Sequence, residues 1–193
     1  MATLIPEKLN SFKVYLEGEE LLGIANVTLP SIEAVTSTVK GAGIAGEYES
    51  PTVGHYKSIR LSIKWLTMTT GATILAKQQS HSLELHGSIQ AFDIASRAYK
   101  YPAIKIRVNG TPTKFDMGKF ESGSTMDSQV DLELTYIKLT RDGEEIYEID
   151  KLNFISKVLG EDALAPIRAG LGMSGDNAIV ESATNKLRSI TGI

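Results

Sequence analysis

Three glycines form the pattern in this chain that most directly suggests cofactor chemistry. Gly41, Gly43 and Gly46 fit G-x-G-x-x-G, a pattern whose glycines bring a backbone turn close to a dinucleotide pyrophosphate at a helix N-terminus. Residues 47–51, which follow, lack the apolar period of a helix, and residues 61–67, where a ribose-binding carboxylate would lie, contain neither Asp nor Glu. We therefore interpret the match as a glycine-containing loop and expect no cofactor.

Histidines are the second group with chemical potential. His81 and His86 could ligate a metal or transfer protons, but an offset of five residues places them on opposite faces of a strand. No cysteine and no regularly spaced third ligand accompanies them. His55 lies in a long connection without an evident partner. We expect ordinary strand-face histidines and no metal site.

Two carboxylates, Asp131 and Glu133, form the third group. Two residues apart on a strand, they share one face at a separation of about 7 Å, which resembles a paired-carboxylate site. General acid catalysis would need one carboxyl group with a raised pKa, hence an apolar pocket or forced proximity, and the sequence signals neither. The G-x-S-x-G and G-x-x-x-x-G-K-[ST] motifs are absent. A solvated acidic face is the better interpretation, and we expect no enzyme activity.

Most elements that position these residues are strands. Apolar and polar residues alternate over residues 59–65, 83–91, 104–108 and 131–136, which predicts half-buried strands with Trp65 in the core. The apolar parity changes between Tyr136 and Ile137, so a bulge or a strand covered on both faces is expected there. Asp142-Gly143 predicts a type I′ hairpin turn, and Asn109-Gly110 predicts another.

The remaining segments complete a mainly β prediction. Residues 12–16 and 21–29 predict a first hairpin that stops at Pro30. Short helices are expected at 73–79 and at 163–171, the second with Asp162 as its cap and Pro166 in its first turn. The fold class is an antiparallel β-sandwich or barrel-like fold with one or two short helices.

Composition limits the possible functions. The chain has 193 residues, 42% hydrophobic and 22% charged, which suits one globular domain. A net charge of -3 with scattered basic residues argues against a protein that grips nucleic acid through its phosphates. The chain contains no cysteine, so disulfides and thiol chemistry play no part. We see no secretory signal and no membrane-spanning run, and expect folding in a cytoplasm.

Two connections are long for a compact domain, residues 30–56 and 118–128. The first carries glycines and aromatic residues, and residues 34–39 could pair as an extra strand. It is either a mobile surface loop or an arm that orders against a neighbouring subunit. For the second alternative the candidate assembly-loop residues are Lys40, Gly41, Gly43, Ile44 and Tyr48.

Several blocks in the chain resemble one family. Residues 135–136, 139–140, 142–145, 148–150 and 153–160 resemble the C-terminal signature of major tail tube proteins from contractile-tailed phages, the FII-like family. Residues 40–44 resemble its glycine block and residues 23–30 its early strand. The similarity runs in order from about Leu9 to Met173, with residues 51–129 recognisable by strand order alone. We expect a tail tube domain over residues 1–173 and a C-terminal extension over 174–193.

The resemblance implies a structural subunit that forms hexameric rings, stacked into the inner tube of a contractile phage tail. Implied partners are further copies of the chain, the tail sheath protein, the baseplate hub, the tape measure protein and double-stranded DNA passing through the lumen without sequence-specific binding. Localisation would be the virion tail, after assembly in the host cytoplasm. An acidic bore would repel DNA phosphates, and the lumen or wall candidates are Glu84, Asp131, Glu133, Glu144 and Glu148.

Two alternatives remain open from sequence. A tube subunit of a phage-derived contractile bacteriocin or injection system would have the same fold with no genome to pass. A small β-barrel binding module would belong to another functional class.

Overall fold

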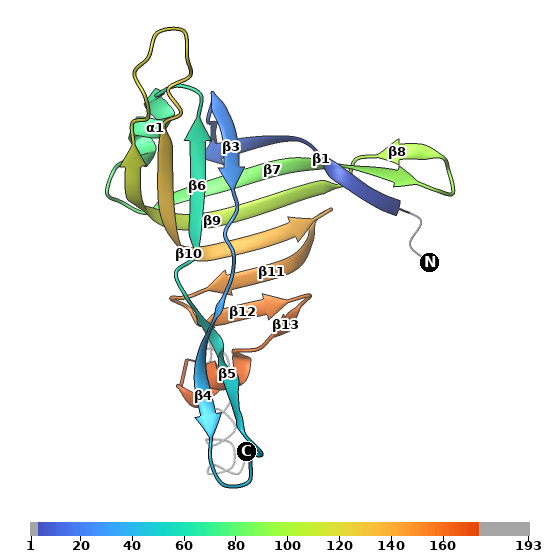
Figure 1. Ribbon diagram of the computed structural model, residues 1–193. Coiled ribbons are helices and arrows are strands. Elements are labelled where there is room, and N and C mark those ends of the chain that lie inside the picture. Colours follow the sequence, from blue (N-terminus) through green and yellow to red (C-terminus); the bar gives the residue numbers. More distant parts are fainter. Residues whose placement is uncertain (1–3, 174–193) are drawn as a thin grey trace, which may run out of the picture.

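The computed structural model describes residues 4–173, which form a mainly β structure with two short helices (Figure 1). The expected C-terminal extension at 174–193 lies outside the described residues. The strands are β1 (Leu4–Leu16), β2 (Glu19–Glu20), β3 (Ile24–Thr28), β4 (Ala34–Lys40), β5 (Glu47–Tyr56), β6 (Arg60–Trp65), β7 (His81–Asp93), β8 (Ala98–Lys100), β9 (Ala103–Asp116), β10 (Gln129–Arg141), β11 (Glu144–Asp150), β12 (Ile155–Val158) and β13 (Glu161–Asp162), and the helices are α1 (Thr70–Leu75) and α2 (Ala165–Gly170).

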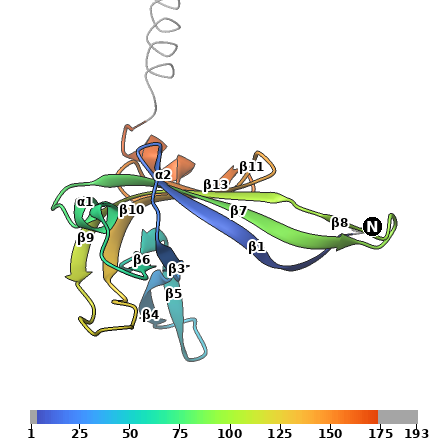
Figure 2. The same ribbon diagram turned by 90° about the horizontal axis from the view of Figure 1, so that it is seen from above.

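Strand β10 joins two layers of antiparallel strands. One layer has the order β13-β12-β11-β10-β9-β7-β1-β2, and β6 with β3 branches from the first half of β10. One edge of β10 pairs first with β6 and then, beyond Leu134, with β11. In Figure 1 β3 and β6 cross the strands of the larger layer steeply, and Figure 2 shows them to one side of it. The arrangement confirms the predicted mainly β fold, with a shared strand forming the corner between layers.

A bulge in β10 makes this corner. Leu134 pairs with Gly110 of β9, but Tyr136 pairs with Asn109, so Thr135 is an inserted residue. The insertion moves the inward-facing positions from Leu132 and Leu134 to Ile137, and all three are buried. The change of parity predicted from sequence is therefore a bulge, which increases local bending.

The core fills the space between the two layers. Strand β6 contributes a fully buried stripe that includes Trp65, which confirms its predicted core position. Strands β7, β9 and β11 and helix α1 cover it from other sides. The most buried large side chains are Trp65, Ile59, Leu61, Ile63, Leu75, Leu83, Leu132, Leu134, Ile149, His81, Val14 and Val108.

The two predicted hairpin turns have different outcomes. Asp142 and Gly143 have positive φ values of 50° and 88° and connect β10 to β11, as predicted. Asn109-Gly110, however, lies inside β9 and makes no turn. At Gly110 an added Cβ would lie 2.8 Å from the Glu133 carbonyl oxygen. The glycine is there because β10 approaches closely at its bulge, so this prediction was wrong.

Other boundaries shift for identifiable reasons. The first predicted hairpin is reduced to the short β1–β2 pairing, because β3 pairs with β6 instead. Helix α1 spans Thr70–Leu75, earlier than predicted, since the Thr69 hydroxyl oxygen accepts a hydrogen bond from the Ala72 amide at 3.2 Å and begins the helix there. Helix α2 lies within its predicted range, but its N-cap is Leu164 and not the predicted Asp162. The Asp162 carboxylate accepts a hydrogen bond from the Leu164 amide at 3.0 Å, just before the helix.

A long ribbon extends from the layered body. The first half of β1, the second half of β7 and β8 form a wing that projects sideways (Figure 2). Along β1, only Tyr15 and Leu16 pair with a strand other than β7 within the described residues. Over residues 4–173 no helix is long and apolar enough to cross a membrane.

Candidate assembly surfaces

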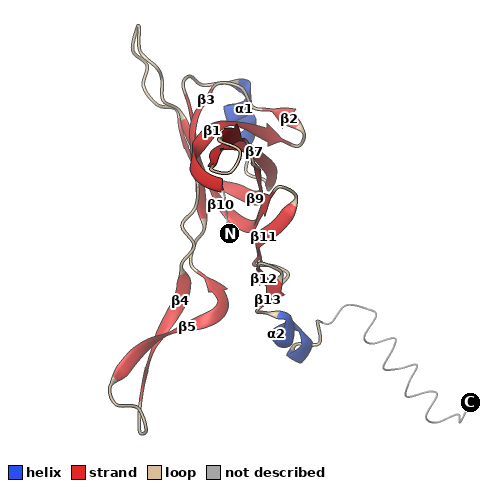
Figure 3. Cartoon of the chain, turned by 90° about the vertical axis from the view of Figure 1, so that its right-hand side faces the viewer, coloured by secondary structure: helices blue, strands red, loops and turns tan. Residues whose placement is uncertain are grey.

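The long connection at 30–56 is largely a two-stranded arm. Strands β4 and β5 pair only with each other among residues 4–173, and the arm projects away from the body (Figures 1 and 3). The extra strand proposed for residues 34–39 is confirmed as β4, with partners supplied by the second half of the same connection. Within residues 30–56, only residues 30–33 and the tip, residues 41–46, lie outside these two strands.

The predicted assembly-loop residues gather at the outer end of this arm. Lys40 ends β4, the glycines form the tip, and Gly43 has a φ of +93° that glycine adopts without strain. Ile44 and Tyr48 are exposed. The G-x-G-x-x-G match therefore lies at a hairpin tip, outside the strand-to-helix setting that dinucleotide binding requires.

The two faces of the arm differ chemically. Val39 pairs with Tyr48, which gives one face an apolar patch next to the tip residue Ile44. On the other face the Thr38 hydroxyl donates a hydrogen bond to the Glu49 carboxylate at 2.8 Å. At this end of the arm Ile44 and Tyr48 are exposed and Val39 is half-buried, whereas the next pair on the same face, Ser37 with Ser50, is polar.

The base of the arm is fastened to the C-terminal part of the fold. The Tyr56 hydroxyl lies 2.7 Å from the Ser156 hydroxyl of β12. Gly54, at a φ of +73°, lies directly against Leu164, since an added Cβ would be 2.3 Å from a leucine methyl carbon. Burial, with Tyr56 beside it, raises the pKa of Tyr147 to about 12. These contacts form an arm clamp, defined here as Gly54, Tyr56, Ser156 and Leu164.

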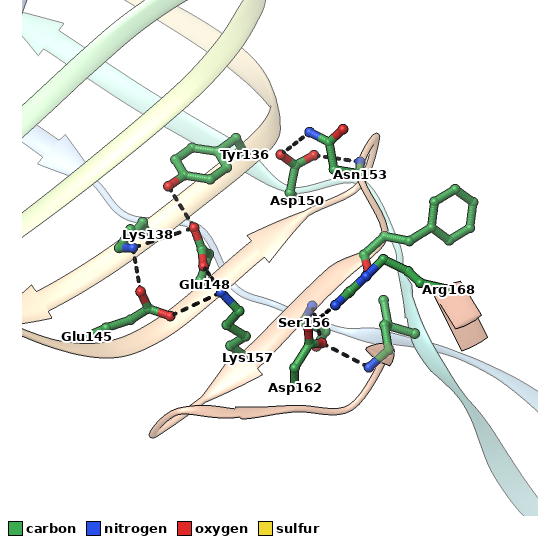
Figure 4. A network of polar contacts seen from close by, with 12 residues as sticks. Tyr136, Lys138, Glu145, Glu148, Asp150, Asn153, Ser156, Lys157, Asp162 and Arg168 are labelled. Atoms are coloured by element: carbon green, nitrogen blue, oxygen red, sulfur yellow. Dashed lines mark hydrogen bonds and ion pairs between the residues drawn. The ribbon is translucent and has the colours of Figure 1, made fainter. Parts of the chain in front are cut away.

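The clamp is supported by an ion pair in the same segment (Figure 4). Arg168 of α2 donates to the Asp162 carboxylate at 2.6 Å and to the Phe154 carbonyl at 2.6 Å. Asp162 also accepts from the Leu164 amide at 3.0 Å. The Arg168 hydrogen bond lowers the pKa of Asp162. These contacts hold Leu164 against Gly54 of the arm.

The lumen and wall candidates are divided among three places. Glu148 lies on the outer face of the larger layer, where Lys157 at 3.1 Å, Lys138 at 3.6 Å and the Tyr136 hydroxyl at 3.0 Å surround its carboxylate (Figure 4). Burial opposes ionisation of Glu148, but its hydrogen bonds outweigh burial and lower the pKa. Glu145 pairs with the same two lysines.

Glu84 lies on the same outer face, on β7. Lys105 contacts it at 2.6 Å, and Arg107 and His86 contact it as well. The Lys105 hydrogen bond, followed by those of His86 and Arg107, lowers the pKa of Glu84 to about 2. Glu84 is therefore charged at any ordinary pH, but its charge is neutralised locally.

Asp131 and Glu133 lie on the first half of β10, beside β6. Asp131 accepts hydrogen bonds from Ser62 at 2.6 Å and from Gln129 at 2.7 Å. Glu133 contacts Ser58 and pairs with Lys151 at 3.3 Å. Burial alone would raise the pKa of Glu133, but these hydrogen bonds together lower it. A general acid needs a raised pKa instead. The pair is a hydrogen-bonded strand face.

Glu144, the fifth candidate, is exposed at the start of β11 beside the hairpin turn. The five carboxylates thus do not form one acidic surface. Sequence reasoning missed the neighbouring cations Lys105, Arg107, Lys138 and Lys157. The sequence shows these four cations, but which carboxylates they contact depends on the register between neighbouring strands.

The histidines occupy opposite strand faces, as predicted. His81 is buried and its Nε2 lies 3.1 Å from the Lys77 carbonyl oxygen, whereas His86 is on the outer face beside Glu84 and 4.9 Å from the Tyr15 ring. Over residues 4–173 no group of three metal-ligating side chains is found.

The second long connection forms a loop at the end of the molecule opposite the arm, next to α1 (Figure 1). Its base is closed by the Lys119 amide donating to the Met126 carbonyl at 2.7 Å and by the Met126 amide donating to the Leu66 carbonyl at 2.8 Å. Phe120 is 100% exposed on this loop. Sequence reasoning identified the connection by its length and did not single out Phe120.

Comparison with known proteins gives a consistent result. The family model for phage tail tube protein FII matches residues 6–172. The tail tube protein of Escherichia phage P2 is 29% identical over 182 residues, covering 88% of this chain and 99% of the relative. The major tail tube protein of Serratia phage KSP20 is 27% identical over 176 residues, covering 89% and 99%.

A solved structure shares the fold. The sheath/tube terminator of PVC, an extracellular contractile injection system, has a TM-score of 0.50 at 14% identity, covering 70% of this chain and 97% of the other. At this identity the likeness concerns the fold alone. The match of the family model over nearly all described residues decides the family: the chain belongs to the phage tail tube protein FII family.

Proposed function

We propose that this chain is the repeating subunit of the inner tube of a contractile phage tail. Six copies form a ring, rings stack into a hollow tube inside the sheath, and DNA passes through the lumen during ejection. Residues 1–173 form the tube domain, with 174–193 as an extension. Family membership supports the tail tube role, and the PVC protein of similar fold is described as a sheath/tube terminator.

The observation that carries ring formation is the open edge of β1. Beyond the β7 pairing, the backbone groups of most of β1 have no strand partner within the described residues. The opposite end of the layer is β13, which is only Glu161–Asp162. Exposed edge groups are a template for pairing with another chain, and neighbouring copies that join edge to edge close a barrel with no free edges.

The outer face of the larger layer suits a lumen wall. It carries Glu84 and Glu148, and we propose that these two of the five candidates face the bore or its wall. The cations that pair with these carboxylates, Lys105, Arg107, Lys138 and Lys157, are spread over several strands. A face of balanced charges offers no continuous basic strip to DNA phosphates. The acidic bore expected from sequence stays a prediction, and on this face cations adjoin both carboxylates.

The remaining partners follow from the same role. We propose contacts with the tail sheath protein, the baseplate hub and the tape measure protein, and assembly in the host cytoplasm. The outer end of the arm, residues 40–48, is the proposed contact between subunits. The relatives are structural tube proteins by name, which agrees with a non-enzymatic role.

Electron microscopy of the expressed chain tests the proposal. We expect tubes whose end views average with sixfold symmetry, either from the chain alone or with the baseplate proteins present as a nucleus. A cryo-EM map then identifies the side chains at the bore. Persistent monomers in the presence of baseplate and sheath proteins would refute the tube role, and a net basic bore would refute the lumen assignment.

A second candidate is a tube subunit of a contractile injection system. The structural likeness to the PVC protein favours its consideration. Neighbouring genes discriminate, since capsid and terminase genes accompany a genome-passing tail.

A further inference from the structure

An apolar groove remains open at the β1 end of the core. It lies between β3 and the inward face of β1, β7 and β9, and its volume is about 130 Å³. We propose that the arm tip of one subunit, residues 41–46, fills the groove of its neighbour in the same ring, with Ile44 as the inserted side chain. This inference rests on the ring closure proposed above and names the partner of the arm. The apolar side chains that line the groove include Leu9, Phe12, Val27, Leu29, Ile104 and Ile106.

The groove exists because the smaller layer stops short of the larger one. Strand β3 ends at Thr28, and the chain then runs toward the arm. Leu9 and Leu29, on the rim, are 53% and 51% exposed. At Gly87, in the floor, an added Cβ would lie 2.9 Å from Leu9 Cδ1 and 2.8 Å from Ile104 Cγ2. The groove is an uncovered rim of the core, and contiguous exposed apolar groups of this kind mark interaction sites.

The size and chemistry of the groove suit one apolar side chain. An apolar cavity of roughly 150 Å³ holds a benzene ring, which is close to the volume of this groove. Ile44 is the large apolar side chain of the tip and is 40% exposed. The other five tip residues are glycine or alanine, so the tip is slim enough to enter between the rim leucines. Ile44 also carries no polar side-chain atom that an apolar lining would leave without a hydrogen bond.

Ring closure brings the arm of one copy to the groove of the next. The arm extends past the β13 end of the larger layer, and β1 lies toward the opposite end (Figure 1). The arm also lies on the same side of that layer as β3 and β6 (Figure 2), which is the side that carries the groove. Copies related by rotation keep the same side toward the ring axis. Where the β13 end of one copy adjoins the β1 edge of its neighbour, the arm therefore crosses the junction on the side of the groove.

The arm is long enough for this contact. The seven residues of β4 span roughly 20 Å at about 3.3 Å per residue. The groove lies over β1, β7 and β9, which places it within roughly 15 Å of the layer edge at about 4.8 Å per strand. Val39 and Tyr48, which pair directly behind the tip, then come to lie over the rim of the groove.

The other protrusions are placed less well for the same groove. Helix α2 is also at the β13 end, but it diverges from the arm toward the other side of the larger layer (Figure 3). The loop at residues 117–128 extends from the end opposite the arm (Figure 1). A copy that contributes its β13 end to the junction therefore holds this loop at its far end, and the arm is the segment that crosses.

Cross-linking distinguishes a contact within a ring from a contact between rings, because the chain has no native cysteine. Tubes of Ala45→Cys/Leu29→Cys, treated with a short bis-maleimide, should give a ladder on a denaturing gel that ends at the hexamer, since contacts within one ring close on themselves. A ladder that continues past the hexamer would mean a contact between rings. Ala45→Cys/Phe120→Cys is the matched control, because Phe120 is fully exposed on the loop, and it should give no ladder.

A second pair of variants tests the inserted side chain. Burial of an isoleucine is favourable enough that Ile44→Ser should lower the sedimenting tube fraction by about tenfold or more. Ile44→Leu is the matched control, because it keeps the apolar volume, and it should assemble like the unmodified chain. Both variants should leave the circular dichroism of the free subunit unchanged, since position 44 lies at the tip of the arm. Normal tubes from Ile44→Ser would overturn the inference.

A cryo-EM map of tubes of the unmodified chain separates this contact from the tube role. We expect Ile44 in contact with Leu9 and Leu29 of the neighbour in the same ring. A groove that is empty, or that is filled by residues 117–128, by residues 174–193 or by an arm from another ring, overturns the contact and leaves the tube standing. Equal ladders from the two cysteine pairs overturn it in the same way. Absence of tubes from the unmodified chain with baseplate and sheath proteins overturns both proposals.

Discussion

The arm clamp gives the sharpest test of how the assembly arm is positioned. Gly54 lies in an irregular part of the arm, where residues 52–55 of β5 face only Val35 of β4. It combines a φ of +73° with direct contact to Leu164. Replacing Gly54 with alanine should therefore strain the backbone and collide with the leucine, loosening the arm from the body.

Two terms set the size of the effect. An alanine in the left-handed region costs about 1–2 kcal/mol, and overpacking against a buried side chain costs about 1–3 kcal/mol. Gly54→Ala should therefore destabilise by about 2–5 kcal/mol. Gly43→Ala is the matched control, because Gly43 has a φ of +93° with nothing within 4 Å of an added Cβ. It should show only the backbone cost of about 1–2 kcal/mol.

A double-mutant cycle isolates the collision. Leu164 is buried, so Leu164→Ala alone should cost about 2–5 kcal/mol. Truncation also makes room for the new methyl group, so the double variant Gly54→Ala/Leu164→Ala should be less destabilised than the sum by about 1–3 kcal/mol. Urea unfolding of the unassembled subunit gives the global values, and hydrogen exchange of arm amides reports local detachment.

Two results would refute this reasoning. One is additivity of the two substitutions within about 0.5 kcal/mol by both measurements. The other is equal destabilisation by Gly54→Ala and Gly43→Ala, which would mean that the arm base does not bear on Leu164.

Three further predictions concern the layers that support the arm. The Lys105 hydrogen bond lowers the pKa of Glu84 from 4.5 to about 2, so the ionised Glu84 stabilises the fold above pH 4.5 and this contribution is lost as the pH falls toward 2. Glu84→Gln should therefore reduce the loss of unfolding free energy between pH 4.5 and 2, measured by urea unfolding, and an unchanged pH dependence would contradict this. Leu132→Ala, in the core, should cost about 2–5 kcal/mol in urea unfolding, whereas the exposed Leu152→Ala should stay within about 0.5 kcal/mol, and similar costs would place Leu132 outside the core. Gly110→Ala should cost about 1–3 kcal/mol through contact with the bulged β10 backbone, measured by thermal unfolding, and a neutral result would argue against close strand approach there.

Several features of the fold follow from local residue types. Asp142-Gly143 makes its hairpin because both residues accept positive φ. The change of apolar parity near Tyr136 predicts the bulge found in β10, because the spacing of apolar residues indicates which side chains face the core. Asn109-Gly110 shows the limit of such signals, since the same dipeptide type is used inside β9 for close packing.

The same distinction between local sequence signals and long-range contacts applies to the assembly surfaces. Sequence by itself determined a mainly β fold, most of its strands with the acidic residues on them, and the long connection that carries the arm, because alternation and turn chemistry are local. Only the tertiary structure decided that the connection is a clamped ribbon, that Glu84 and Glu148 are neutralised by cations on neighbouring strands, and that the loop at residues 117–128, with its exposed Phe120, extends from the end opposite the arm. Those facts depend on strand register and on how the layers cross, which bring together residues far apart in the chain.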